Sequence, residues 1–157
     1  MKRRHIGIIS DTHGLARPEA ISALKGSDLI IHAGDVGTPE VLRTLREIAP
    51  VIAVRGNVDR EPWAQALRVS ETVKVEQSWF YVIHDVTELN LDPVAAGFRA
   101  VIYGHSHRPS IQTRNGVLFL NPGSAGPRRF SLPITVALLY VTGSSLEPQW
   151  VELETVR

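Results

Sequence analysis

Seven side chains of the kinds that bind metal ions follow short apolar segments of the sequence, and each lies beside or near a glycine or a turn. They are Asp11, His13, Asp35, Asn57, His84, His105 and His107. Carboxylate, imidazole and amide groups bind divalent cations through oxygen and nitrogen, and the chain has no cysteine that would add a sulfur ligand. The residue types therefore predict a metal site with nitrogen and oxygen ligands.

The spacing within three of these segments gives each a physical rationale. Asp11 and His13 are separated by one residue, so a slight twist at a strand end can aim both at one ion. Asp35 lies between glycines, and the two oxygens of such a free carboxylate can bridge two cations. His105 and His107 point in divergent directions from one loop, which suits two different ions. Viewed alone, Asp11, Asp35 and the histidine pair also fit turn caps and surface residues.

Each of three further polar residues has two alternative roles. The amide oxygen of Asn57 can coordinate a metal while its NH₂ holds a phosphate oxygen, or the residue belongs to an ordinary Gly-Asn turn. Asp59 either supports the metal loop or caps a helix before Pro62. His32 either orients Asp35 or is a hydrogen-bonded core histidine.

The elements that must position these side chains are short buried strands. The first part of the chain predicts strands over 6–10, 28–32 and 51–54, a helix over 18–25, and a second helix with Thr38 as its cap and Pro39 first. This β-α-β-α-β order is typical of a layered α/β domain with a parallel sheet. Ligands in such folds bind beyond the carboxyl ends of the strands, where the candidate ligands lie.

The second part predicts mainly antiparallel strands. They cover 68–75, 79–84, 100–103, 111–114, 117–120, 134–141 and 150–153, with a short helix over 93–98. Asn115-Gly116 between two of them is a strong signal for a type I′ hairpin. We therefore expect two sheets packed face to face with helices outside.

The bulk composition limits the classes of function. A length of 157 residues, 43% of them hydrophobic, suits one globular domain, 1–157. A net charge of +1 gives no general attraction to nucleic acid or anionic lipid, so strong nucleic-acid binding is not expected. No segment approaches the length of a membrane span, and the charged N-terminus lacks the rest of a signal peptide. We expect a soluble cytoplasmic protein.

The ordered set of segments resembles the motifs of the calcineurin-like metallophosphoesterases. Asp11-x-His13, Gly34-Asp35, Gly56-Asn57, His84 and Gly104-His105-Ser106-His107 carry the resemblance. The short chain without a cap insertion is similar to the small YfcE-like phosphodiesterase subgroup, as is the segment Asn121-Pro122-Gly123-Ser124. The resemblance implies an α/β fold, a four-layer α/β/β/α sandwich of two mixed β-sheets flanked by helices, with no cap domain.

The resemblance also implies a ligand set and a reaction. Asp11, His13, Asp35 and His107 would hold one divalent ion, and Asp35, Asn57, His84 and His105 the other, with Asp35 as the bridge and Mn²⁺ as first candidate ahead of Ni²⁺, Fe or Zn²⁺. A hydroxide bridging the ions would attack the phosphorus of a small diester. Asn57, Asp35 and His84 are therefore also the expected catalytic residues.

The sequence departs from the family pattern at two positions. Val58 stands where many relatives have a histidine that protonates the leaving group, which favours activated aryl diesters over alkyl ones. Asp85-Val86 replaces the Gly-His that usually follows the histidine at His84. Asp85 is either a carboxylate near the site or a cap for the residues after it.

A different class of function shares this fold. The resemblance extends to the retromer subunit, a protein-interaction scaffold with a degraded metal site. Since every expected ligand position here keeps a coordinating side chain, we expect a phosphoesterase rather than a scaffold. A family nuclease would need an added DNA-binding region. The expected partner is a small phosphate-ester substrate, and a homodimer is compatible with the resemblance.

Overall fold

Two five-stranded β-sheets form the body of the protein. The computed structural model describes residues 2–129 and 131–153. The first sheet has the order β10-β9-β1-β2-β3 and the second the order β4-β5-β6-β8-β7. The first contains β1 (Arg3–Ile9), β2 (Leu29–His32), β3 (Val51–Ala53), β9 (Thr135–Thr142) and β10 (Ser145–Glu152). The second contains β4 (Ser70–Val75), β5 (Ser78–Ile83), β6 (Phe98–Ile102), β7 (Ser110–Arg114) and β8 (Val117–Asn121).

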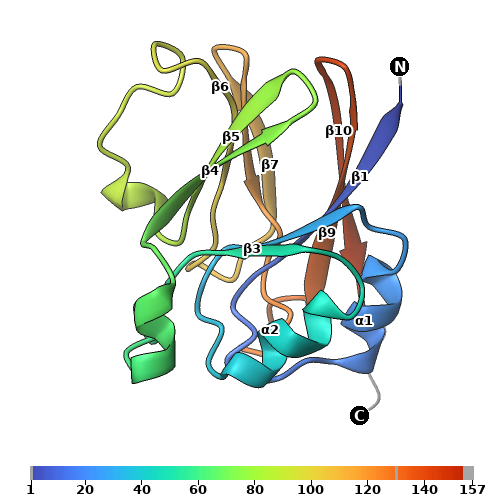
Figure 1. Cartoon of the computed structure of the whole chain (residues 1–157), viewed down its shortest axis with the longest axis vertical. Helices are drawn as coiled ribbons and strands as arrows, with labels where there is room; N and C mark the ends of the chain where they lie inside the picture. The colour runs from blue at the N-terminus through green and yellow to red at the C-terminus, as the bar shows by residue number, and fades with distance from the viewer. Residues whose placement is uncertain (1, 130, 154–157) are drawn as a thin grey trace.

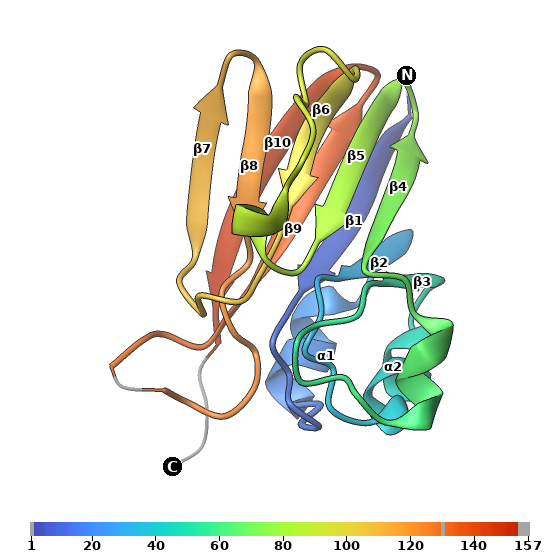
Figure 2. The ribbon, with the colours of Figure 1, turned by 90° about the vertical axis from the view of Figure 1, so that its left-hand side faces the viewer.

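The main core lies between the two sheets. Strand residues of both, such as Ile8, Ile31, Phe80 and Ile102, are fully buried in one apolar cluster. Strands β1 and β5 are buried along most of their length, as expected for central strands covered on both faces. Figure 2 shows the second sheet in front of the first.

Two helices cover the other face of the first sheet (Figure 1). They are α1 (Pro18–Leu24) and α2 (Pro39–Arg46), each with proline at its start, where the missing N–H breaks no helical hydrogen bond. Leu24 and Leu45 pack with Ile9 and Ile30 of the sheet in a second apolar cluster. No helix in the described part of the chain is long and apolar enough to span a membrane.

The outer face of the second sheet is covered by the segment that follows β5. This segment contains the 3₁₀ turn η2 (Val86–Glu88), and Val86, Leu89 and Leu91 pack against Tyr81 and Ile83 of β5. A second 3₁₀ turn, η1 (Pro62–Ala66), precedes β4. The predicted α/β sandwich of two mixed sheets is thus confirmed.

One local prediction held in part and another was wrong. The strands of the second part of the chain pair mainly antiparallel, as predicted, in β4–β5, β7–β8, β9–β10 and β9–β1, but β6 runs parallel to both β5 and β8. The helix predicted over 93–98 is a single turn, capped by the Asp92 side chain and ended by Gly97 with φ of 83°. The predicted hairpin at Asn115-Gly116 is present, with φ values of 51° and 80°.

Candidate metal centre

The candidate ligands lie on five loops that meet at one end of the sandwich. Because β1, β2 and β3 are parallel, and β5 is parallel to β6, the carboxyl ends of these strands point the same way. Backbone hydrogen bonds tie the loops together, from Asp11 N–H to Gly34 O (3.0 Å) and from Gly104 N–H to His84 O (2.9 Å). The parallel pairs that the sequence prediction missed are what bring the histidine loops to this end.

Glycine is required where two of these loops touch. A Cβ on Gly56 would lie 2.1 Å from Asp35 Oδ1, and one on Gly104 would lie 2.1 Å from Ser10 Oγ and 2.7 Å from Asp11 Oδ2. Any side chain at either position would therefore separate the loops and move a candidate ligand. The glycines in the Gly-Asn and Gly-His segments thus have a steric role.

Asp11 is the most buried of the candidate ligands, with no exposed surface. Its Oδ2 accepts hydrogen bonds from Ser10 Oγ (2.8 Å) and from the backbone N–H of His105 (3.1 Å). Three imidazole Nε2 atoms surround Oδ1 instead, those of His107 at 3.4 Å, His84 at 3.8 Å and His13 at 3.9 Å. Burial raises the pKa of Asp11, and it outweighs the charges of His84 and His107 and the hydrogen bond from Ser10, which act to lower it.

Asp35 lies between the same histidines, and its two oxygens have different neighbours. Its Oδ1 accepts the backbone N–H of Val58 at 3.1 Å. Its Oδ2 lies 3.2 Å from His84 Nε2 and 3.7 Å from His13 Nε2. Burial acts to raise the pKa of Asp35, but the hydrogen bond and charge of His84 outweigh it, so the pKa lies below its usual value. Oδ2 is therefore the oxygen that faces the histidines.

His84 is oriented by the main chain of the first sheet. Its Nδ1 donates to Ala33 O at 2.7 Å, which leaves the lone pair of a neutral ring on Nε2. That atom faces the carboxylates of Asp35 and Asp11, an arrangement that needs a proton or a cation between them. Burial acts to lower the pKa of His84, yet the hydrogen bond with Asp35 and the charge of Asp11 raise it overall.

The four histidines form two pairs around the two carboxylates. The rings of His13 and His107 lie 5.4 Å apart, and those of His84 and His105 lie 5.2 Å apart. Donor atoms of Asp11, His13 and His107 form one compact group, and those of Asp11, Asp35 and His84 form another. These groups differ from the expected ligand sets, because Asp11 rather than Asp35 is common to both and His105 belongs to neither.

Two kinds of unfavourable feature concentrate at this site. Several buried side-chain atoms in the described chain have no hydrogen-bond partner, and four of them belong to this site. They are Asp11 Oδ1, His13 Nε2, His84 Nε2 and His107 Nδ1. Five candidate ligands have left-handed backbone conformations, with φ from 47° to 74°: Asp11, His13, Asp35, His105 and His107. Each such non-glycine residue costs roughly 1–2 kcal/mol. Unpaired donors and strained backbone indicate a site built to hold a ligand rather than to stabilise the fold.

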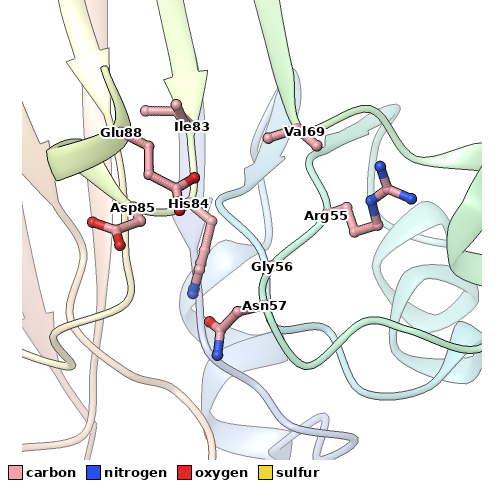
Figure 3. Close-up of a pocket in the computed structure, with 8 residues that line it drawn as sticks. All are labelled: Arg55, Gly56, Asn57, Val69, Ile83, His84, Asp85 and Glu88. Carbon is pink, nitrogen blue, oxygen red and sulfur yellow. The ribbon is translucent and has the colours of Figure 1, made fainter. Parts of the chain in front are cut away.

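Asn57 and Val58 lie at the exposed rim of the centre. Both side chains are exposed, Val58 by 44%. Figure 3 shows Asn57 beside His84 in a pocket that both residues line. The structure thus brings Asn57 next to the other candidate ligands, while Val58 presents only an apolar side chain there.

The role of Asp59 is to hold loops together. Its buried carboxylate accepts the backbone N–H groups of Gly56 (2.9 Å), Gly37 (3.0 Å) and Val36 (3.2 Å). It therefore fixes the loops that carry Asn57 and Asp35. Of its two predicted readings, support of the metal loop is the one observed.

His32 is a hydrogen-bonded core histidine. Its Nδ1 accepts the N–H of Gly34 at 3.1 Å, and its Nε2 lies 2.9 Å from Thr12 Oγ1, whose hydroxyl donates to Val36 O. Complete burial lowers the pKa of His32 to about 3, so the ring is neutral and ties the Asp11 and Asp35 loops together.

Sequence reasoning missed the supporting role of the segment after β8. Asn121 Nδ2 donates to Gly104 O and to Ser106 Oγ, both at 3.1 Å, and Ser124 Oγ donates to Asp11 O at 3.1 Å. The sequence analysis identified Asn121-Pro122-Gly123-Ser124 as a family segment, but the residues that Asn121 and Ser124 contact are far away in sequence. Asp85 combines both of its predicted readings, since Oδ1 accepts from Thr87 N and Oδ2 lies 3.8 Å from His105 Nε2.

Comparison with known proteins defines the class. The model of the calcineurin-like phosphoesterase superfamily domain matches residues 5–144, so the chain belongs to this superfamily. It is 35% identical over 156 residues to a probable metallophosphoesterase of Methanothermobacter thermautotrophicus, covering 92% of this chain and 90% of the relative. It is 28% identical over 160 residues to the phosphodiesterase YfcE of Escherichia coli, covering 83% and 84%. The chain is therefore a metal-dependent hydrolase of phosphoric esters.

Solved structures share its fold. A structure described as a novel archaeal phosphodiesterase superposes with a TM-score of 0.78 at 24% identity, covering 95% of this chain and 99% of that one. The Vps29 protein of Entamoeba histolytica, in a complex with Zn²⁺, superposes with a TM-score of 0.74 at 22% identity, covering 94% and 98%. Both likenesses concern the fold alone.

Proposed function

We propose that the protein is a phosphodiesterase for small diesters with a dinuclear metal centre. The observation that supports it best is the group of buried, unpaired donor atoms on Asp11, His13, His84 and His107. These nitrogen and oxygen atoms fit divalent first-row cations, with Mn²⁺ as first candidate and Ni²⁺, Fe or Zn²⁺ as alternatives. His13 and His107 would hold one ion and His84, His105 and Asn57 the other, with the carboxylates between them.

The two ions would supply a hydroxide at neutral pH, bridging them, and would neutralise charge that develops on the phosphoryl oxygens. The protein's own groups do the remaining work. Asp35 Oδ2 faces both histidine pairs, and the Ala33 carbonyl fixes the His84 ring. The NH₂ of Asn57, which lies beside His84 in Figure 3, would donate to a phosphoryl oxygen.

Protonation of the leaving group is the step for which this chain is least equipped. Val58 occupies the rim position where a general acid would be needed, and its exposed isopropyl group can donate no proton. Activated aryl esters, whose leaving groups depart as anions, should therefore be the best substrates. Plain alkyl diesters should be hydrolysed more slowly.

A Mn²⁺-dependent assay tests the proposed function. The protein is stripped with chelator, reloaded with Mn²⁺, and given bis(para-nitrophenyl) phosphate, para-nitrophenyl phosphate and a dialkyl phosphate. We expect metal-dependent hydrolysis in the order aryl diester, aryl monoester, dialkyl diester. Turnover that is unchanged by chelator, or no turnover with any of the four metals, would contradict the proposal. The second outcome would favour the scaffold function, which the Vps29 likeness supports only at the level of the fold.

A further inference from the structure

A pocket adjoins the candidate metal centre between the end of β5 and the loop after β3. It encloses about 480 Å³, part of it open to solvent, and is lined by Arg55, Gly56, Asn57, Val69, Ile83, His84, Asp85 and Glu88. Figure 3 shows Ile83, His84, Asp85 and Glu88 on one side and Arg55, Gly56, Asn57 and Val69 on the other. Because His84 and Asn57 belong to both the pocket and the centre, a phosphoryl group at the centre can direct one ester group into the pocket.

The walls of this pocket combine an apolar surface with acidic groups. Ile83 and Val69 supply the apolar part, and Val69 is 46% exposed although it is a large hydrophobic residue. Asp85 and Glu88 supply two carboxylates from the same side. A short alkyl chain that ends in a polar or charged group would bury its carbons against Ile83 and Val69, and its polar end would lie near the carboxylates of Asp85 and Glu88.

The charge of the pocket is not balanced from within. Two basic side chains line it, and both are directed elsewhere. Arg55 Nη1 donates to Gln65 Oε1 at 3.0 Å, which holds the guanidinium toward η1, and His84 Nε2 faces Asp35 and Asp11. In the part of the chain that the structure describes, Glu88 forms no ion pair. Asp85 directs Oδ1 to Thr87 and leaves Oδ2 toward His105. A carboxylate with no cationic partner, beside an apolar wall, favours a ligand that brings the cation.

We propose, on the basis of the phosphodiesterase function above, that this pocket binds one ester group of the substrate and selects phosphodiesters whose alkyl ester ends in a cation. Aminoalkyl and trimethylammonioalkyl esters are the chemical class. Like charge disfavours a second phosphate or a carboxylate in the same place. The residues that set this specificity are Glu88 and Asp85, and neither needs to contact the reacting phosphorus.

A matched pair of substrates tests the inference. The first is para-nitrophenyl phosphorylcholine. The second is para-nitrophenyl neohexyl phosphate, its neutral isostere, in which carbon replaces the quaternary nitrogen. The leaving group is the same, so the ratio of their kcat/KM values reports on the second ester group. At low salt we expect a ratio of about five to ten in favour of the cationic ester, typical of one partly exposed charge interaction.

Variants of the two acidic residues test whether this kcat/KM ratio depends on the pocket. Glu88→Gln should lower it about threefold, and Asp85→Asn with Glu88→Gln should bring it near one. The matched control is Glu47→Gln, an exposed acid at the end of α2 outside the pocket, which should leave the ratio as in wild type. Methyl NMR signals of Val69 and Ile83 in the metal-free protein should also shift more with the cationic ester than with the neutral one.

The outcomes separate the two proposals. Equal hydrolysis of both esters by the wild type, or an unchanged ratio in the Glu88→Gln Asp85→Asn variant, would overturn the pocket inference and leave the phosphodiesterase function standing. Hydrolysis of neither ester with Mn²⁺, Ni²⁺, Fe or Zn²⁺ would overturn both.

Discussion

The two ends of the β-sandwich both contain non-glycine residues with positive φ, but they use them differently. At the hairpin end, Glu76 and Asn115 lie in tight turns joining antiparallel strands, at φ of 54° and 51°. Both are exposed, and the turn geometry itself demands the conformation. At the opposite end of the sandwich, the conformation is adopted by the buried Asp11, Asp35 and His107, the half-buried His13 and the exposed His105, where no hairpin requires it. The two ends can be compared in Figure 1.

The two ends of the sandwich also differ in how their polar and charged groups are paired. Arg4 and Glu76 form an ion pair at 2.6 Å near the hairpin end, so charge there is matched within the protein. At the metal-centre end, the carboxylates of Asp11 and Asp35 face imidazoles, and four buried polar atoms have no hydrogen-bond partner. Ser78 Oγ near the hairpin end is also buried without a partner, but four such atoms lie together at the metal-centre end. Their concentration there, with the left-handed backbone of five candidate ligands, indicates that binding of a cation offsets their cost.

The largest expected effect is the loss of activity on removing the central carboxylate. Asp35→Ala should lower kcat/KM for an aryl diester by at least about 10³-fold, beyond the 10–100-fold typical of an outer residue of a metal site. Steady-state assays with Mn²⁺ measure it. The control at the hairpin end is Asn115→Ala, which should keep full activity. Comparable losses in the two variants would remove the functional distinction between the ends.

Asp59→Ala should destabilise the fold by about 2–3 kcal/mol, because three backbone N–H groups lose a buried acceptor. Urea unfolding of the metal-free protein measures it. The matched control is Asp92→Ala, since Asp92 caps Val94 and Ala95 in an exposed turn and should cost about 1 kcal/mol or less. Equal costs would mean that Asp59 is an ordinary cap.

Val58→His should add a proton donor at the rim of the centre. We expect kcat/KM for a dialkyl phosphate to rise about tenfold or more, since general acid catalysis typically contributes 10²–10⁴-fold where geometry is ideal. The rate for an aryl diester, which needs no acid, should change little. An equal gain for both substrates would point to tighter metal binding rather than to proton transfer.

The stability of the metal-free protein should fall as pH rises, through His84. The folded protein raises the pKa of His84 above its usual 6.5, so the folded state holds this proton more tightly than the unfolded state. The resulting stabilisation is complete below about pH 6 and is lost as the pH passes the raised value. His84→Gln should remove about 1 kcal/mol of this pH dependence in urea unfolding between about pH 6 and 9. Parallel curves for wild type and variant would contradict the assignment.

The smallest expected effect is relief of backbone strain. His105→Gly in the metal-free protein should raise the free energy of unfolding by about 1 kcal/mol or less, because φ of 74° suits glycine. Asn115→Gly should gain less, since asparagine already tolerates this conformation. Calorimetry in the presence of chelator measures both. Destabilisation by His105→Gly would show that the side chain stabilises the fold without metal.

Local patterns in the sequence predict most elements of the fold. Proline at the helix starts, buried apolar runs and Asn115-Gly116 located α1, α2, most strands and the β7–β8 hairpin. The parallel pairing of β5, β6 and β8 was not predicted, because it depends on which strands meet after long connections. Likewise, 93–98 has helical composition, but Gly97 limits it to one turn.

The candidate ligands could be named from the sequence, and so could a supporting role for Asp59, but the groups that the supporting residues contact could not. Each ligand follows a strand, so its position was visible locally. The acceptors and donors that fix them come from distant segments: Asp59 holds the Asp35 loop, and Asn121 holds the loop of His105. Only the folded chain reveals that Asp35 Oδ1 is already engaged by Val58 N–H.

The most direct test is a count of bound metal. The protein is stripped, dialysed against excess Mn²⁺, washed and analysed by elemental analysis together with electron paramagnetic resonance. The account predicts two Mn²⁺ per chain with the spectrum of a spin-coupled pair, and their loss in Asp35→Ala. One isolated ion per chain, or none, would contradict a dinuclear centre between the two histidine pairs.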